Sequence, residues 1–136
     1  MKVKLIVLCL VTAVLLSLPA CSSAAPKEFS VDITSSGKDI RMTAGDTLTI
    51  TLESNITTGY SWNENTNIGD NTVIQQTAHK YQPPAVTIPG AGGNEIWNLK
   101  ALKVGSSAIS MEYRRPFEPN AEPANTFTLT VIVQIK

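Results

Sequence analysis

The sequence predicts an all-β protein, built as an antiparallel β-sandwich of seven to eight short strands. Short runs of residues alternate between apolar and polar side chains, the period of a half-buried strand. Turn-forming residues separate these runs, and no segment after the first twenty or so residues carries a sustained apolar period of 3.6. Many short strands with frequent turns favour a sandwich. A small closed barrel is the alternative architecture.

The N-terminus predicts export. Lys2 and Lys4 precede the apolar run Leu5–Leu18, which has the pattern of a signal peptide and is short for a membrane span. The run ends in Leu18-Pro19-Ala20-Cys21, which resembles the lipobox of bacterial and archaeal lipoproteins. This resemblance implies cleavage before Cys21 and lipidation of its thiol. A signal peptide without lipidation, or an N-terminal anchor that is never cleaved, is the alternative.

Residues 1–20 are therefore expected to be a lipoprotein signal peptide and residues 21–27 a lipidated cysteine with a short tether. Two or three acyl chains on one cysteine anchor a protein firmly, so we expect attachment to the outer face of a cell membrane, bacterial or archaeal. Cys9 would leave with the signal peptide and Cys21 would carry lipid. The mature chain would then have no disulfide.

Residues 28–136 are enough for one domain with its own core and too few for two. Without Lys2 and Lys4, nine basic side chains face eleven acidic ones, and Arg114-Arg115 is the one adjacent cationic pair. Nucleic-acid binding requires neutralisation of many phosphates, so this composition argues against it.

The first half of the domain contains five segments that are expected to be strands. Glu28–Thr34 is expected to be the first strand, and a short run before Ala44-Gly45-Asp46 the second. Thr47–Leu52 alternates strictly and is the third strand. Tyr60–Glu64 is the fourth, because Tyr60 and Trp62 share a face. The stretch Asn65–Asn71 is rich in turn residues, and Val73–Tyr81 is a strand with weaker alternation.

The second half begins with an irregular segment. Gln82–Asn94 contains three prolines and three glycines and is expected to be a loop. Strands follow at Glu95–Leu102, around Ile109, Met111 and Tyr113, and at Phe127–Ile135, with a tight turn at Val104–Ser106 and a proline-rich loop from Arg115.

Three connections of unusual composition should meet at one end of the sandwich. If consecutive strands run antiparallel, every second connection lies at the same end. Counted from the strand that ends at Leu52, these are Asn55–Gly59, Gln82–Asn94 and Arg115–Pro123. Loops gathered at one end of a sandwich are a common way to build a binding surface. We expect a protruding ridge, which suits insertion into a cleft on a partner protein better than capture of a small molecule.

The residues of these loops form a recognisable pattern. Asn-Ile-Thr-Thr-Gly-Tyr at 55–60, Gly-Ala-Gly-Gly at 90–93 and Arg-Pro-Phe at 115–117 resemble the three loop motifs of the chagasin-like cysteine peptidase inhibitors. Those motifs are usually Asn-Pro-Thr-Thr-Gly-aromatic, Gly-x-Gly-Gly and Arg-Pro-Trp. Their order and spacing agree, and the resemblance covers nearly all of the chain after the tether.

The resemblance implies an immunoglobulin-like β-sandwich and reversible, non-covalent inhibition of papain-like cysteine peptidases. It implies that Thr57 and Thr58 enter the active-site cleft of the peptidase, that Gly59 permits close approach, and that Asn55 and Tyr60 brace the loop. It further implies that two other groups flank this loop in the complex: Gly90, Gly92 and Gly93, and Arg115, Pro116 and Phe117.

Two residues depart from the family pattern. Ile56 replaces the usual proline, so the loop is less rigid before Thr57 and ordering it on binding could weaken affinity. Phe117 replaces the usual tryptophan and offers a smaller ring without an indole N–H. Both changes bear on potency rather than on the kind of activity.

Other functions have weaker support in the sequence. His79 is the one histidine, on a strand expected to be remote from the three loops, and no nucleophile, metal-ligand or phosphate-loop motif accompanies it. The sequence therefore predicts neither an enzyme nor a cofactor or metal, and a monomer is expected. The second hypothesis is a lipid-anchored adhesion or carbohydrate-binding module that uses Tyr60, Trp62, Tyr81 or Phe117 as stacking platforms.

Overall fold

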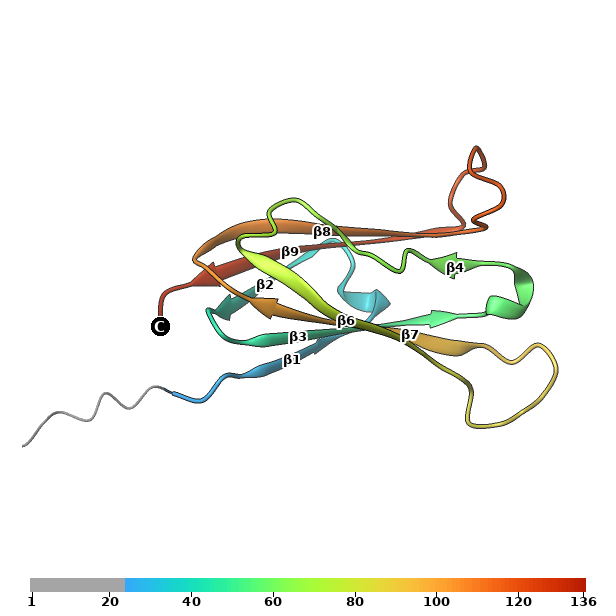
Figure 1. The fold of residues 1–136 in the computed structure, drawn as a ribbon, viewed down its shortest axis with the longest axis horizontal. Coiled ribbons are helices and arrows are strands. Elements are labelled where there is room, and N and C mark those ends of the chain that lie inside the picture. The colour runs from blue at the N-terminus through green and yellow to red at the C-terminus, as the bar shows by residue number, and fades with distance from the viewer. Residues whose placement is uncertain (1–23) are drawn as a thin grey trace, which may run out of the picture.

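Residues 24–136 are described by a computed structural model, and the expected signal peptide and Cys21 lie outside them. Two β-sheets pack face to face (Figure 1). The first sheet has the order β1 (Glu28–Val31), β3 (Thr47–Ser54), β7 (Gly93–Ala101) and β6 (Ile74–Gln82). The second has the order β2 (Lys38–Thr43), β9 (Asn125–Gln134), β8 (Gly105–Arg114) and β4 (Ser61–Trp62), with β5 (Asn67–Ile68) also paired to β8.

The core lies between the sheets and is made by the apolar side of each alternating strand. Leu48, Ile50 and Leu52 of β3 are buried, as are the inward-facing residues of β9 from Phe127 to Val133. Trp97 of β7, opposite Ile50 in the register, is fully buried at the centre. This arrangement confirms the predicted immunoglobulin-like sandwich rather than a closed barrel.

The strand pairing differs from the prediction in two places. Most neighbours are antiparallel, but β1 pairs with β3 and β2 pairs with β9 in parallel. The chain crosses from one sheet to the other between β1 and β2 and crosses back between β2 and β3, so neither β1 nor β2 forms a hairpin with its successor in sequence. Each of these two N-terminal strands lies at the edge of its sheet.

Several element boundaries also differ. The first strand ends at Val31 rather than Thr34, because a 3₁₀ turn (Ile33–Ser35) begins where the Asp32 carboxylate accepts a hydrogen bond from Thr34 N. The predicted strand Tyr60–Glu64 is reduced to Ser61–Trp62, and the turn-rich stretch after it contains β5. Gln82 and Asn94, predicted to lie in a loop, pair with each other at the ends of β6 and β7. Gly105 and Ser106, predicted to form a turn, begin β8.

The expected tether is partly fixed. Residues 24–26 are exposed, but Lys27 already hydrogen-bonds through its backbone to the Asp46 carboxylate and to Thr47 N. Within residues 24–136, no helix has the length and apolarity needed to cross a membrane.

Candidate functional site: three loops at one end

The β3–β4, β6–β7 and β8–β9 connections lie at one end of the sandwich, opposite the C-terminus (Figure 1). Direct contacts join them. The Asn55 side-chain amide donates a hydrogen bond to Gly90 O at 2.9 Å, which links the first loop to the second. The ring of Phe117 packs against Gly59, which links the first loop to the third. The predicted convergence of the three loops is thus confirmed.

The first loop is a single 3₁₀ turn over Ile56–Thr58 that exposes its tip. Asn55 holds the turn from below. Its side-chain oxygen accepts a hydrogen bond from the Thr57 hydroxyl, and its backbone carbonyl accepts one from the Thr58 hydroxyl, both at 2.6 Å. Gly59 ends the turn with φ of 79°, a left-handed conformation that favours glycine. Four consecutive residues, Asn55 to Thr58, therefore form a small closed unit.

Two residues of the third loop cover the C-terminal side of this turn. Phe117 is 68% exposed, yet two of its ring carbons would lie only 3.1 and 3.2 Å from a Cβ at position 59. The Arg115 guanidinium carbon lies 4.6 Å from the centre of the Tyr60 ring, within cation–π range. Arg115 also faces the Glu118 carboxylate at 3.4 Å. Pro116 between them is exposed.

The glycines of the second loop have different roles. Gly90 has φ of 84° and supplies the carbonyl that Asn55 binds. A Cβ at Gly92 would lie 3.3 Å from Ser54 O and 3.5 Å from the Asn55 Cβ. A Cβ at Gly93 would overlap the Gln82 carbonyl and the Tyr81 ring, so only glycine fits where β7 begins. The motif thus keeps the second loop close to the first.

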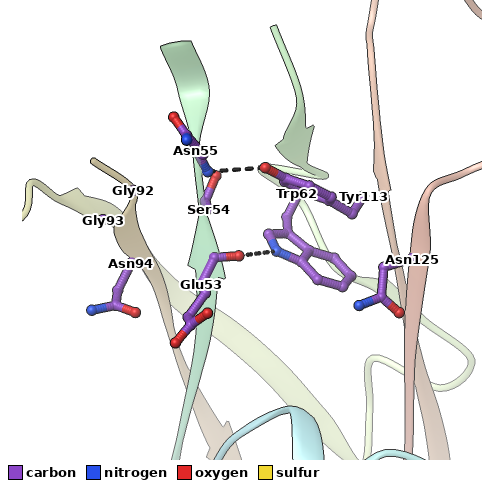
Figure 2. Close-up of a pocket in the computed structure, with 9 residues that line it drawn as sticks. All are labelled: Glu53, Ser54, Asn55, Trp62, Gly92, Gly93, Asn94, Tyr113 and Asn125. Carbon is purple, nitrogen blue, oxygen red and sulfur yellow. Dashed lines mark hydrogen bonds between the residues drawn. The ribbon is translucent and has the colours of Figure 1, made fainter. Parts of the chain in front are cut away.

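An aromatic cluster supports the loops from the side of the core. Tyr113 of β8 stacks on Tyr60 with ring centres 5.4 Å apart and contacts Trp62 at 5.2 Å. Figure 2 shows the Tyr113 hydroxyl accepting a hydrogen bond from Asn55 N and the Trp62 indole N–H donating one to Glu53 O, both at 2.9 Å. Asn55, Trp62 and Tyr113 border a polar pocket of about 550 Å³ below the loops. Ring contacts and hydrogen bonds therefore support the three loops from the core side.

His79 lies closer to the three loops than the sequence predicted. His79 occupies the half of β6 nearer the three loops, stacks on Trp97 and places its Nε2 3.0 Å from one carboxylate oxygen of Glu95. The other oxygen of the buried Glu95 accepts a hydrogen bond from Trp62 N. The pair thus holds β4, the strand that follows the first loop.

Two apolar residues near the site were missed by sequence reasoning. Val86 and Ile88 in the β6–β7 loop are 65% and 62% exposed. The signal was present, because they are the large aliphatic residues of a segment too rich in proline to form a strand. Together with Ile56 and Phe117 they make the loop end partly apolar. Within residues 24–136, four of the eight large apolar side chains that are exposed therefore lie on the three loops.

The site lacks the groups that a metal centre would need. Within the described part of the chain, no three histidine, cysteine or carboxylate side chains lie close enough to hold a metal ion. The groups that the three loops do expose are hydroxyl, backbone and apolar groups.

Comparison with known proteins agrees with this geometry. Residues 41–131, more than half of the chain, match the family described as the Chagasin family peptidase inhibitor I42. The chain belongs to the chagasin family. Amoebiasin-1 of Entamoeba histolytica is 36% identical over 95 residues, which cover 70% of this chain and 89% of that relative.

Solved structures of chagasin-type inhibitors share the fold. The crystal structure of the cysteine protease inhibitor EhICP2 from Entamoeba histolytica matches with a TM-score of 0.66 and 24% identity, over 79% of this chain and 96% of that chain. The structure of PbICP-C in complex with falcipain-2 matches with a TM-score of 0.56 and 23% identity, over 82% and 93% of the two chains. Membership of the chagasin family leaves the adhesion or carbohydrate-binding alternative without support.

Proposed function

We propose that this chain is a reversible, non-covalent inhibitor of papain-like cysteine peptidases, and that its three-loop end enters the active-site cleft. The observation that carries this proposal is the mutual support of the loops. Asn55 binds Gly90, Phe117 covers Gly59, and the tip at Thr57 and Thr58 is left exposed. The peptidase-binding residues are those that the family resemblance implies: Asn55, Thr57, Thr58, Gly59, Tyr60, Gly90, Gly92, Gly93, Arg115, Pro116 and Phe117.

The shape of the first loop explains how it could block a peptidase without being cut. A cysteine peptidase acts on an extended chain whose carbonyl reaches both the thiolate and the oxyanion hole. The Asn55 and Ile56 carbonyls instead accept hydrogen bonds from Thr58 N and Gly59 N within the 3₁₀ turn. These bonds hold the backbone curled, so no carbonyl of the turn is presented in an extended register.

Preorganisation favours tight binding. Side chains and loops that are already ordered lose little conformational entropy when they dock, and the saving appears mainly as slow dissociation. Here the Asn55 side chain uses both its oxygen and its nitrogen to fix two loops. These hydrogen bonds order the loop although position 56 is isoleucine rather than proline.

The test is a titration of papain with the soluble domain, residues 22–136. We expect stoichiometric loss of activity that is recovered on dilution, because no covalent bond forms. Thr57→Asp should weaken inhibition by more than tenfold, because it brings a charge into a desolvated cleft, and should leave the melting temperature nearly unchanged because Thr57 is exposed. Full papain activity at micromolar inhibitor, or unaltered inhibition by this variant, would contradict the proposal.

We also propose that the protein is exported and anchored through lipid on Cys21. Ala24 and Lys136, joined by a hydrogen bond of 2.9 Å, lie at the end opposite the loops (Figure 1). An anchor there would leave the inhibitory end facing away from the membrane. The full chain should partition into detergent and take up labelled fatty acid, and Cys21→Ser should abolish both. Label retained by that variant would refute lipidation of this cysteine.

A further inference from the structure

Ile56, which replaces the proline of the family pattern, completes an acceptor sequence for a covalent modification in the first loop. Asn55-Ile56-Thr57 has the form asparagine, any residue except proline, then threonine, which is the acceptor sequence for N-glycosylation. The proline of the usual family pattern would forbid it. We propose that Asn55 is an N-glycan acceptor and that the glycan blocks the three-loop end. The proposal rests on the proposed export and, for its consequence, on the proposed inhibition.

The sequence singles out this asparagine. No other asparagine of the chain is followed by a residue other than proline and then by serine or threonine. The acceptor also lies where glycosylation requires it, in an exposed surface turn rather than in a strand. Asn55 itself is half-buried, and Ile56 and Thr57 are exposed, with Ile56 50% accessible.

The side-chain contacts leave the amide nitrogen reachable. Its hydrogen bond to Gly90 O, 2.9 Å long, is an exposed contact between two loops, outside the core, and needs only one of the two N–H groups of the amide. The Thr57 hydroxyl already lies 2.6 Å from the Asn55 side-chain oxygen. The two acceptor-sequence side chains are thus in contact in the folded protein.

The transfer is chemically balanced with a polyprenyl phosphate-linked oligosaccharide as donor. The Asn55 Nδ2 forms a bond to the anomeric carbon of the first sugar and loses one proton. The bond from that carbon to the phosphate oxygen breaks, and the lipid phosphate leaves with the electron pair. No oxidant or reductant is needed.

The product would carry its glycan between the first and second loops. The amide would keep one N–H, but the sugar would occupy space beside Gly90, Gly92 and the tip at Thr57. A peptidase cleft that fits the closely packed loops has no room for an added oligosaccharide. The glycosylated form should therefore be a much weaker inhibitor than the unmodified form.

The first experiment is mass spectrometry of the full chain, purified from cells that export it and N-glycosylate exported proteins. Asn67→Thr provides an internal control, because it gives the exposed Asn65 the same acceptor pattern outside the three loops. We expect glycan on Asn55 in the otherwise unchanged chain and with Thr57→Ser, and none there with Ile56→Pro or Thr57→Ala. Glycan on Asn65 with Asn55 unmodified in the same molecules would overturn the proposal.

The second experiment compares two forms purified from the same cells. Lectin affinity separates glycosylated from unmodified chain, and each is titrated against papain. We expect the glycosylated form to inhibit about 100-fold more weakly. Equal inhibition by the two forms would overturn the blocking effect. Absence of inhibition by the unmodified form would instead contradict the proposed function, while the mass measurement still decides the glycan site.

Discussion

Gly59 combines two constraints that can be separated by experiment. Gly59 and Gly37 have nearly equal φ values of 79° and 78°, but only a Cβ at Gly59 would meet a neighbour, the Phe117 ring. Gly59→Ala and Gly37→Ala should each lower the free energy of unfolding by about 1 kcal/mol, because alanine is strained in the left-handed region. Only Gly59→Ala should weaken papain inhibition, by roughly tenfold. Equal inhibition by both variants would show that the packing of Phe117 on this turn is irrelevant to binding.

Phe117 tests the other departure from the family pattern. Its ring is largely exposed while one edge lies on Gly59, so a larger ring can extend into solvent without displacing the core. Phe117→Trp should keep or improve inhibition, because indole adds contact area and a hydrogen-bond donor. Inhibition constants for papain measure this directly. A clear loss of affinity would mean that the third loop docks in another orientation.

At the level of residues, the sequence predicts which side chains meet but not how they bond. The spacing of motifs indicated that Asn55, Gly90 and Phe117 share one end of the molecule. Asn55 links two loops because its side-chain amide binds Gly90, which is 35 positions away in sequence. Local sequence patterns do not encode such a contact. The same holds for His79 and Glu95, which lie diagonally across β6 and β7 and meet only because these strands adopt one register.

The β6–β7 loop as an element should contribute apolar contact to the complex. Val86 and Ile88 are exposed beside the proposed interface, and burying each against a peptidase would contribute about 1.5 kcal/mol or more. Replacing both by serine should weaken papain inhibition by at least about tenfold and leave the melting temperature unchanged. Leu102 and Val104, exposed at the opposite end, provide the matched control. Similar inhibition by both double variants would exclude the loop from the interface.

Strands were predictable where alternation was long and one face was buried. Thr47–Ser54 and the strand through Val131 follow their patterns closely, because a buried face fixes both period and register. Of the two-residue strands, β4 was predicted too long and β5 was missed, since their extent depends on pairing with β8 and on side chains such as Gln76, which binds Glu64 O and Thr66. The early end of β1 followed from a local cap that competes with the strand.

The two ends of the described domain differ, because the three loops form one end and its termini lie at the other. At the end opposite the three loops, the first and last described residues, Ala24 and Lys136, are joined by a hydrogen bond (Figure 1). At the terminal end the Asp46 carboxylate is buried and accepts hydrogen bonds from Lys27 N and Thr43 N, both at 2.8 Å. Asp46 thus fixes the point at which the domain begins, far from the surface that would bind a peptidase.

Asp46 should make stability depend on pH without affecting inhibition. The backbone N–H of Lys27, then that of Thr43, lowers the pKa of the Asp46 carboxyl below its ordinary value of 3.8. A carboxyl with a lowered pKa in the folded state stabilises the fold above its ordinary pKa, and this contribution is lost as pH falls through the folded-state pKa. Asp46→Asn should therefore lower the free energy of unfolding by roughly 2 kcal/mol near neutral pH, and the difference in this free energy from the unmodified protein should narrow below pH 3.8.

Asp32 and Asp70, whose pKa values are lowered by Thr34 and Thr72, remain in the variant and retain part of the dependence of stability on acid. Thermal unfolding across this pH range measures the effect, and papain titration near neutral pH should give the same inhibition constant for both proteins. A difference in stability that stays constant down to low pH would show that ionisation of Asp46 does not stabilise the fold.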